Sequence, residues 1–133
     1  MSERRQSVTR IALADDDPLT LEVLRSALSA PGVELHEASS GAELLSLLAD
    51  PDPFDLVVTD VSMSWMSGLE VMLGARDAGI AVPVLVITGL ADPEIQADVS
   101  RLGRARLLRK PVGAQQLRES VADLLAGAVR RAT

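Results

Sequence analysis

The sequence predicts an α/β domain in which one parallel sheet lies between two layers of helices. Five short apolar runs alternate along the chain with five segments whose apolar residues recur at helical spacing. This alternation is typical of a parallel sheet, because each helix carries the chain back to the edge where the next strand begins. The composition agrees, since 47% of the 133 residues are hydrophobic and only 2% are aromatic. An aliphatic core of this kind suits helices packed on a buried sheet.

The predicted strands are short apolar runs that stop at a polar residue. In the clearest of them, residues 56–60, the run ends in the carboxylate of Asp60, which predicts a strand buried on both faces. Pro83 lies near the start of the fourth run, where a strand tolerates a missing N–H donor. The five runs cover residues 11–14, 33–38, 56–60, 82–87 and 105–109.

The predicted helices begin at capping signals. Asp17 precedes Pro18, a residue favoured in the first helical turn. Ser40 and Glu43 have the spacing of a capping box, and Ser67 can cap a third helix. A fourth helix opens at residues 92–93 and has the thinnest apolar face. The apolar positions that mark the five helices are Leu21, Leu24 and Leu28; Leu44, Leu45, Leu47 and Leu48; Leu69, Val71, Met72 and Ala75; Ile95, Val99 and Leu102; and Leu117, Val121, Leu124 and Leu125.

The composition excludes several kinds of partner and chemistry. The formal net charge is −6 and the pI is about 4.7, which argues against duplex nucleic acid or an anionic membrane as the main partner. The absence of cysteine excludes disulfides and thiolate chemistry. No segment approaches the ~20 apolar residues of a membrane span, and the first residues lack a signal-peptide core. We therefore expect a cytoplasmic protein.

Polar residues follow four of the predicted strands. Five strands fit the doubly wound order 2-1-3-4-5, in which the winding reverses between the first and third strands. This order brings Asp15 and Asp16, after the first strand, beside Asp60 at the end of the third. Thr88 follows the fourth strand, and Lys110, the only lysine of the chain, follows the fifth. The sequence therefore predicts three carboxylates, a hydroxyl and an ammonium group in one crevice.

This set of side chains suits phosphoryl transfer to a carboxylate. Two carboxylates ~4 Å apart repel by roughly 4 kcal/mol at an effective dielectric of 20. A hard divalent cation relieves this repulsion, and all-oxygen ligation with retained waters suits Mg²⁺. Asp60 can act as an in-line nucleophile and form an acyl phosphate. Mg²⁺, Lys110 and the Thr88 hydroxyl can supply the positive charge and donors that the phosphoryl oxygens need.

At these motifs the chain resembles the receiver domain of two-component response regulators. The resemblance implies a flavodoxin-like, doubly wound (βα)5 fold over residues 9–128, with a flexible N-terminal tail at 1–8 and a C-terminal tail at 129–133. It rests on four motifs in the family's order at the expected strand ends: residues 14–18 (Ala-Asp-Asp-Asp-Pro), 60–68 (Asp to Gly), 86–89 (Val-Ile-Thr-Gly) and 108–111 (Leu-Arg-Lys-Pro).

The resemblance also implies a role for each site residue. Asp60 would be the phosphoacceptor and a Mg²⁺ ligand, Asp16 a direct ligand, and Asp15 a ligand that acts through water. Ser62 would offer its backbone carbonyl to the metal. Thr88 would be the switch hydroxyl. Lys110 would pair with the phosphoryl group, and its bond to Pro111 would be cis.

Three positions depart from the family's pattern. Ser64 stands where the family usually has proline, and Ser67 stands where an acid or asparagine is usual. Leu107 replaces a tyrosine or phenylalanine whose inward swing reports phosphorylation in the family. The chemistry should survive these changes, whereas the usual output mechanism depends on the residue that is replaced.

The leading hypothesis is a single-domain receiver that accepts a phosphoryl group from a phosphohistidine on a sensor histidine kinase or histidine phosphotransfer protein. It would catalyse only its own phosphorylation and dephosphorylation and act on a downstream protein effector. It would be a monomer or a weak homodimer through the fourth helix, fifth strand and fifth helix. Because the sequence ends soon after its last helix, it would lack an effector domain or be a fragment of a longer regulator.

Two alternatives remain open. A receiver-like interaction module would signal without phosphorylation, and Leu107 motivates this reading. A phosphohydrolase of the haloacid dehalogenase type would want a second acid at residue 62, where serine stands. Two surface features also have two readings. Trp65 can contact a partner or shield its loop, and a set of arginines can form a partner-binding patch or a solvated face: Arg101, Arg104, Arg106 and Arg109.

Overall fold

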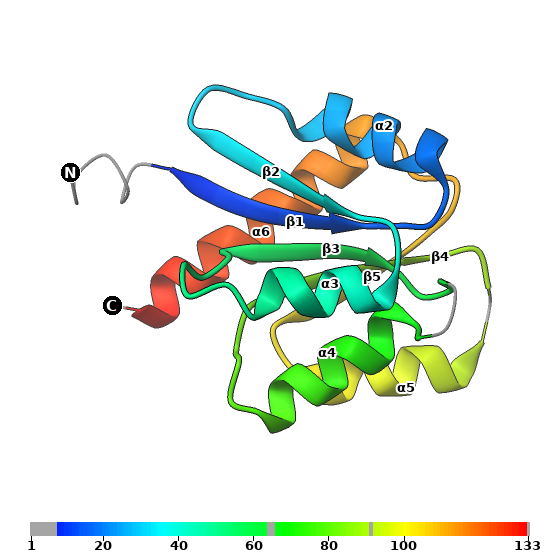
Figure 1. Ribbon diagram of the computed structural model, residues 1–133. Coiled ribbons are helices and arrows are strands. Elements are labelled where there is room, and N and C mark those ends of the chain that lie inside the picture. Colours follow the sequence, from blue (N-terminus) through cyan, green and yellow to red (C-terminus); the bar gives the residue numbers. More distant parts are fainter. Residues whose placement is uncertain (1–7, 64–65, 91, 133) are drawn as a thin grey trace.

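Five strands form one parallel sheet, and they are β1 (Thr9–Ala14), β2 (Val33–Ala38), β3 (Leu56–Asp60), β4 (Val84–Thr88) and β5 (Ala105–Arg109). The computed structural model describes residues 8–63, 66–90 and 92–132. The strand order is β2-β1-β3-β4-β5, which confirms the order expected from the sequence (Figure 1). β1 and β3 are paired at the point where the winding reverses, and ligands bind beside that point in sheets of this kind.

Two strand starts differ from the sequence-based expectation. β1 begins two residues earlier, because Thr9 and Arg10 also pair with Val33 and Glu34 of β2. β4 begins two residues later than expected. Pro83 has no N–H to donate to the sheet, although its carbonyl accepts a hydrogen bond from Val57 N at 3.0 Å.

Five helices cover the two faces of the sheet (Figure 1). α2 (Pro18–Leu28) and α6 (Ala114–Ala132) pack on one face, and α3 (Gly41–Leu48), α4 (Gly68–Asp77) and α5 (Pro93–Leu102) pack on the other. The expected thin apolar face of α5 is confirmed, with Ile95, Val99 and Leu102 as its buried residues. Within the described ranges, no helix has the length and apolar character needed to cross a membrane.

The core is aliphatic and lies in two layers, one on each side of the sheet. All five residues of β3 are buried, and they alternate between the layers. Leu56 and Val58 pack with α2 and α6, whereas Val57 packs with α3, α4 and α5. A strand buried on both faces fixes its register strongly, because a slip of one residue would send every side chain to the opposite layer. This register determines where Asp60 lies.

The helix caps agree with the sequence in kind and differ in one detail. The side chains of Asp17, Ser40 and Ser67 each accept a hydrogen bond from a backbone N–H of the first helical turn. In a capping box, the glutamate would accept from the backbone N–H of the cap itself. Here Glu43 Oε1 instead accepts from Ser39, at 2.6 Å from its N and 2.8 Å from its Oγ. The cap therefore also holds the residue before it.

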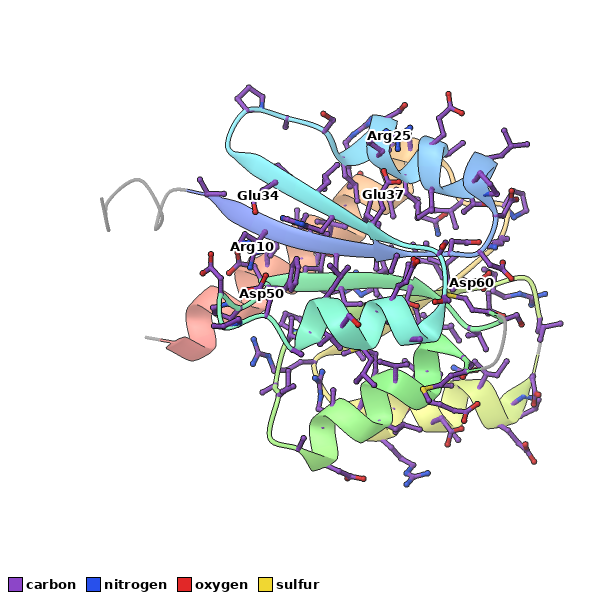
Figure 2. The ribbon with its side chains drawn as sticks, in the orientation of Figure 1. Arg10, Arg25, Glu34, Glu37, Asp50 and Asp60 are labelled. Atoms are coloured by element: carbon purple, nitrogen blue, oxygen red, sulfur yellow. The ribbon has the colours of Figure 1, made fainter. Side chains whose placement is uncertain are left out.

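A buried arginine joins several elements near the N-terminal ends of β1 and β2. Arg10 is only 7% exposed, and its Nε donates to Glu34 Oε1 at 2.9 Å. Its Nη1 donates to the backbone carbonyl of Asp52, and its guanidinium lies 4.4 Å from the centre of the Phe54 ring. Figure 2 shows Arg10 and Glu34 on neighbouring strands near Asp50, whose carboxylate lies 3.7 Å from Arg10 Nη2. Arg10 therefore joins β1, β2 and the connection between α3 and β3.

His36 lies on β2, outside the crevice where the site residues meet. It is half-buried, and its ring meets the Phe54 ring edge-on with 5.4 Å between their centres. Its Nε2 lies 2.6 Å from Glu34 Oε1. His36 therefore packs with the same side chains that surround Arg10, namely Glu34 and Phe54.

Arg10→Met should lower the free energy of unfolding by about 2 kcal/mol, because it leaves backbone carbonyls and acidic side chains without their cation. Arg25→Met is the matched control. Arg25 is half-exposed and pairs with Glu37 across α2 and β2, and its loss should cost less than about 1 kcal/mol. Urea denaturation of both variants measures the difference. Equal losses would show that Arg10 does not tie the strands together.

Candidate functional site

Three carboxylates meet at the C-terminal edge of the sheet. Asp15 follows β1, and Asp60 ends β3, the neighbouring strand. Each of Asp15, Asp16 and Asp60 offers a carboxylate oxygen within 4.8 Å of the others. Asp15 and Asp60 are buried, at 1% and 7% exposed, whereas Asp16 faces solvent. Figure 2 shows Asp60 at the end of its strand. The structure therefore brings these three carboxylates together, as the sequence predicts.

Lys110 follows β5 and reaches this cluster along the same C-terminal edge of the sheet. Its Nζ donates to Asp60 Oδ2 at 3.1 Å and to Asp15 Oδ2 at 3.3 Å. Its backbone N donates to Thr88 O at 2.8 Å, which aligns the ends of β4 and β5. The bond between Lys110 and Pro111 is cis, as the resemblance implies. One ammonium group therefore bridges two buried carboxylates from separate strands.

Burial and charge both shift the pKa values of these groups. Burial raises the pKa of Asp15, and the charge of Asp60 adds to this effect, whereas the hydrogen bond from Asp17 N and the ammonium group of Lys110 lower that pKa in part. Burial lowers the pKa of Lys110, but its hydrogen bond to Asp60 and the two carboxylate charges outweigh this and raise that pKa overall. Three carboxylates share one ammonium group, so a further cation would stabilise the ionised cluster.

The donor set fits a hard divalent cation. Asp15, Asp16 and Asp60 supply only oxygen ligands, and the exposed side of the cluster leaves room for waters, as Mg²⁺ prefers. Asp60 Oδ1 accepts a hydrogen bond from Ser62 N at 3.2 Å, while Lys110 contacts Oδ2. The two oxygens of Asp60 are therefore held by different partners, and this fixes the plane of the carboxylate.

Thr88 lies at the end of β4 with its side chain 1% exposed. Its Oγ1 accepts a hydrogen bond from Leu90 N at 3.0 Å. Leu107 pairs with Val86 in the sheet and is partly buried against the layer that contains α5. Thr88 is thus part of the crevice wall, but its hydroxyl is hydrogen-bonded to the loop that follows β4. Two residues of the sequence analysis, Ser64 and Trp65, lie outside the described residues.

A cavity of about 540 Å³ adjoins the site, and no motif in the sequence predicts it. It lies between α2 and the start of α6, and the stem of Lys110 forms part of its wall. Leu19 and Val23, on its α2 side, are 71% and 56% exposed. Their spacing of four residues, outside the buried stripe of α2, was the available signal. The site therefore has an apolar neighbour on one side.

A five-stranded parallel sheet in this order, with an acidic cluster and a lysine at its C-terminal edge, defines a receiver-like domain. The sequence model of the family described as "Response regulator receiver domain" matches residues 11–122. The chain belongs to the response regulator receiver family. A receiver domain structure from Methanospirillum hungatei, described as CheY-like, is 25% identical with a TM-score of 0.85, covering 94% of this chain and 99% of that one.

Curated relatives are response regulators with longer chains. The transcriptional regulatory protein KdpE of Mycobacterium tuberculosis is 33% identical over 126 residues, which cover 95% of this chain and 53% of the relative. The glycerol metabolism activator of Pseudomonas putida is 26% identical over 122 residues, which cover 90% of this chain and 55% of the relative. The chain therefore spans about half the length of these relatives.

Asp15→Asn should stabilise the metal-free protein at neutral pH. The pKa of Asp15 is raised in the folded state, so the folded protein holds the Asp15 proton more tightly than the unfolded chain does. This stabilisation is fully present at a pH below the pKa of an ordinary aspartate, and it is lost as the pH rises through the folded-state pKa. The gain from the substitution should therefore shrink as the pH falls. Thermal unfolding in chelator at neutral and mildly acidic pH measures it.

Asp16→Asn is the matched control for this prediction, because Asp16 is exposed and pays little for burial. Saturating Mg²⁺ should raise the unfolding temperature of the wild-type protein, since a ligand that binds the folded state stabilises it. A lower stability of Asp15→Asn in chelator at neutral pH would show that its carboxylate is not in excess there.

Proposed function

We propose that this protein is a Mg²⁺-dependent phosphoacceptor of two-component signalling, with Asp60 as the residue that accepts the phosphoryl group. The observation that carries the proposal is the position of Lys110, whose Nζ bridges Asp60 and Asp15. A nucleophilic carboxylate needs positive charge beside it when the phosphoryl group arrives. The family supports the same reading, because its members are response regulators.

The residues of the site divide the chemistry among themselves. Mg²⁺, when bound by Asp15, Asp16, Asp60 and the carbonyl of Ser62, would neutralise charge on the transferring phosphoryl oxygens. A carboxylate nucleophile has no proton to lose, so Asp60 would need no general base to attack phosphorus. The phosphorus–nitrogen bond of phosphohistidine breaks as the bond to Asp60 forms, and the departing imidazole nitrogen takes a proton from solvent. Lys110 and the hydroxyl of Thr88 would donate to the phosphoryl oxygens.

We further propose a single receiver unit over residues 9–128 that acts in the cytoplasm. Its donor would be a sensor histidine kinase or a histidine phosphotransfer protein, and its target a protein effector. Phosphorylation would change the surface formed by α5, β5 and α6, through which the chain would act as a monomer or weak homodimer. The exposed Arg106 and Arg109 of β5 would take part in that surface.

An interaction module that signals without phosphorylation is the second candidate. It is favoured by Leu107, which has no aromatic ring or hydroxyl to report a change at Thr88. The phosphohydrolase alternative has less support, since Ser62 offers Asp60 a backbone N–H where a second catalytic acid would be needed.

Incubation with a small acyl phosphate and Mg²⁺ should add one phosphoryl group to the chain, and Asp60→Asn should remove it. Chelation of Mg²⁺ should abolish the reaction. Lys110→Met should slow it at least about tenfold, because the transition-state charge loses a cation. Intact-protein mass spectrometry with hydroxylamine treatment measures the adduct. An adduct that persists in Asp60→Asn would place the chemistry elsewhere, and no adduct in the wild type would favour the interaction module.

The apolar cavity supports a protein as the physiological donor. A small phosphodonor needs only the site itself, whereas a protein donor must also cover the surface around it. The cavity wall includes Lys110, so a protein that fills the cavity brings its own residues next to Asp60. Leu19 and Val23 would then be buried by the donor, and their exposure in the free chain would be explained.

The donor for this test is a phosphorylated histidine phosphotransfer protein that modifies the wild-type chain. Val23→Asp should lower the rate of phosphoryl transfer from this donor about tenfold, which corresponds to ~1.4 kcal/mol. The rate with a small acyl phosphate should not change. Leu45→Asp is the matched control, because Leu45 is 50% exposed on α3, on the opposite face of the sheet. Parallel kinetic assays with both donors test the prediction. Equal effects of both substitutions would show that the cavity face is not used.

A further inference from the structure

Two glycines hold the last part of the connection from β3 to α4, residues 66–68, against the end of β3, where Asp60 lies. They are Gly41, the first residue of α3, and Gly68, the first residue of α4. Each follows a capping serine and precedes a glutamate by two residues, in the pattern Ser-Gly-x-Glu. Both glycines are buried. The N-terminus of α3 therefore contacts Met66, and the N-terminus of α4 contacts the end of β3.

Gly68 lies against the end of β3. A Cβ on Gly68 would overlap Thr59 Oγ1 and lie 2.5 Å from the backbone oxygen of Asp60. Both approaches are closer than the 3.0 Å that real Cβ contacts keep. Thr59 Oγ1 is itself fixed, because it donates to the same oxygen of Asp60 at 3.0 Å and is fully buried. The space for a side chain at Gly68 is thus closed by the phosphoacceptor strand itself.

Gly41 meets the same connection from the other side. A Cβ on Gly41 would overlap the backbone oxygen of Met66 and lie 2.9 Å from Met66 Cβ. Backbone atoms cannot move aside as the end of a flexible side chain can. Residues 66–68 are thus held between Gly41 of α3 and the end of β3.

The requirement at both positions is the absence of a side chain, not an unusual backbone. The positive φ values of the described glycines belong to Gly32, Gly79 and Gly103. Alanine is otherwise a better helix former than glycine, so glycine at the first position of each helix costs stability. This cost has a compensating reason at both positions, because each glycine allows a close approach beside Asp60 that a side chain would prevent.

We propose that Gly41 and Gly68 are positioning residues that hold Ser62 on the carboxylate of Asp60. Ser62 lies two residues after Asp60, and its N–H donates to Asp60 Oδ1 at 3.2 Å. A Cβ at residue 68 would push on Thr59 and Asp60 at the end of β3, and a Cβ at residue 41 would displace Met66 and, two residues on, Gly68. Either change would move Asp60 away from Ser62 N and from Lys110. This inference rests on the proposed function, since the positioned group is the proposed phosphoacceptor.

The test compares Gly41→Ala, Gly68→Ala and Gly74→Ala. Gly74 is the matched control, because it lies in α4 and a Cβ there meets nothing within 4 Å. At a temperature where unfolding curves show all variants folded, Gly41→Ala and Gly68→Ala should phosphorylate at least about tenfold more slowly at saturating donor and Mg²⁺, since small misplacements cost catalysis heavily. Gly74→Ala should match the wild-type rate and stability or exceed the stability.

The amide NMR signal of Ser62 supplies a readout without phosphorylation or metal. It should shift in Gly41→Ala and Gly68→Ala and stay in place in Gly74→Ala. If the wild-type chain takes up no phosphoryl group, the proposed function fails, and the Ser62 signal still decides the positioning of the loop. Rates within about twofold of wild type in both variants, or an unmoved Ser62 signal, would overturn the proposal.

Thr59→Ala provides a second background in case Gly68→Ala alone fails to fold. It removes the overlap with Thr59 Oγ1 but leaves the 2.5 Å approach to the backbone oxygen of Asp60. The double variant should fold and still phosphorylate at least about tenfold more slowly than Thr59→Ala. Full recovery of the rate in the double variant would show that the overlap with Thr59 Oγ1 alone caused the loss, and that the approach to Asp60 O has no effect on the rate.

Discussion

Lys110 donates to Asp15 and Asp60 from positions 95 and 50 residues away in the chain. Neither contact can form until β1, β3 and β5 are in register and in the right order. The three carboxylates would repel one another if they were gathered without this cation. The charge arrangement at the edge of the sheet is therefore a product of the whole fold, and any change in strand order or register would break it.

The two ends of β1 show opposite solutions to buried charge. At the N-terminal end, the Arg10 guanidinium is satisfied by Glu34, Asp52 and the backbone around them, so this cluster only stabilises. At the C-terminal end, Asp15 is buried with a raised pKa and shares its one cation with Asp60. A metal ion would stabilise the second cluster, because three carboxylates share one ammonium group there.

The sequence predicted the strand order and the meeting of the acidic residues because each signal is local. An apolar run that ends in Asp60 marks its own strand end, and the general rules of parallel sheets bring such ends together. Arg10 was missed because one charged residue at a strand start has no pattern. The close approach at Gly41 and Gly68 was missed because a Ser-Gly pair looks the same whether or not another backbone lies against it.

The same limit applies to the cavity beside Lys110. Its walls come from α2 and from the start of α6, which are separated by most of the chain, so no short window of sequence contains it. The exposed Leu19 and Val23 suggested only a surface turn of an amphipathic helix. Sequence patterns report which face of an element is buried, whereas concave surfaces depend on how two elements stand apart.

Leu107 limits how a change at Asp60 can reach the rest of the molecule. An aromatic residue with a hydroxyl can exchange a buried position for an exposed one and gain hydrogen bonds to water in the second. Leucine has no polar end, so leaving the partly buried site beside Val86 would only expose apolar surface. The side chain at residue 107 therefore favours one state whether or not Asp60 is modified. A signal from the proposed phosphorylation of Asp60 would then be read mainly at the loops that follow β3 and β4. The bond between Thr88 and the exposed Leu90 lies in one of those loops, and it is the contact that a phosphoryl group drawing on the Thr88 hydroxyl would disturb first.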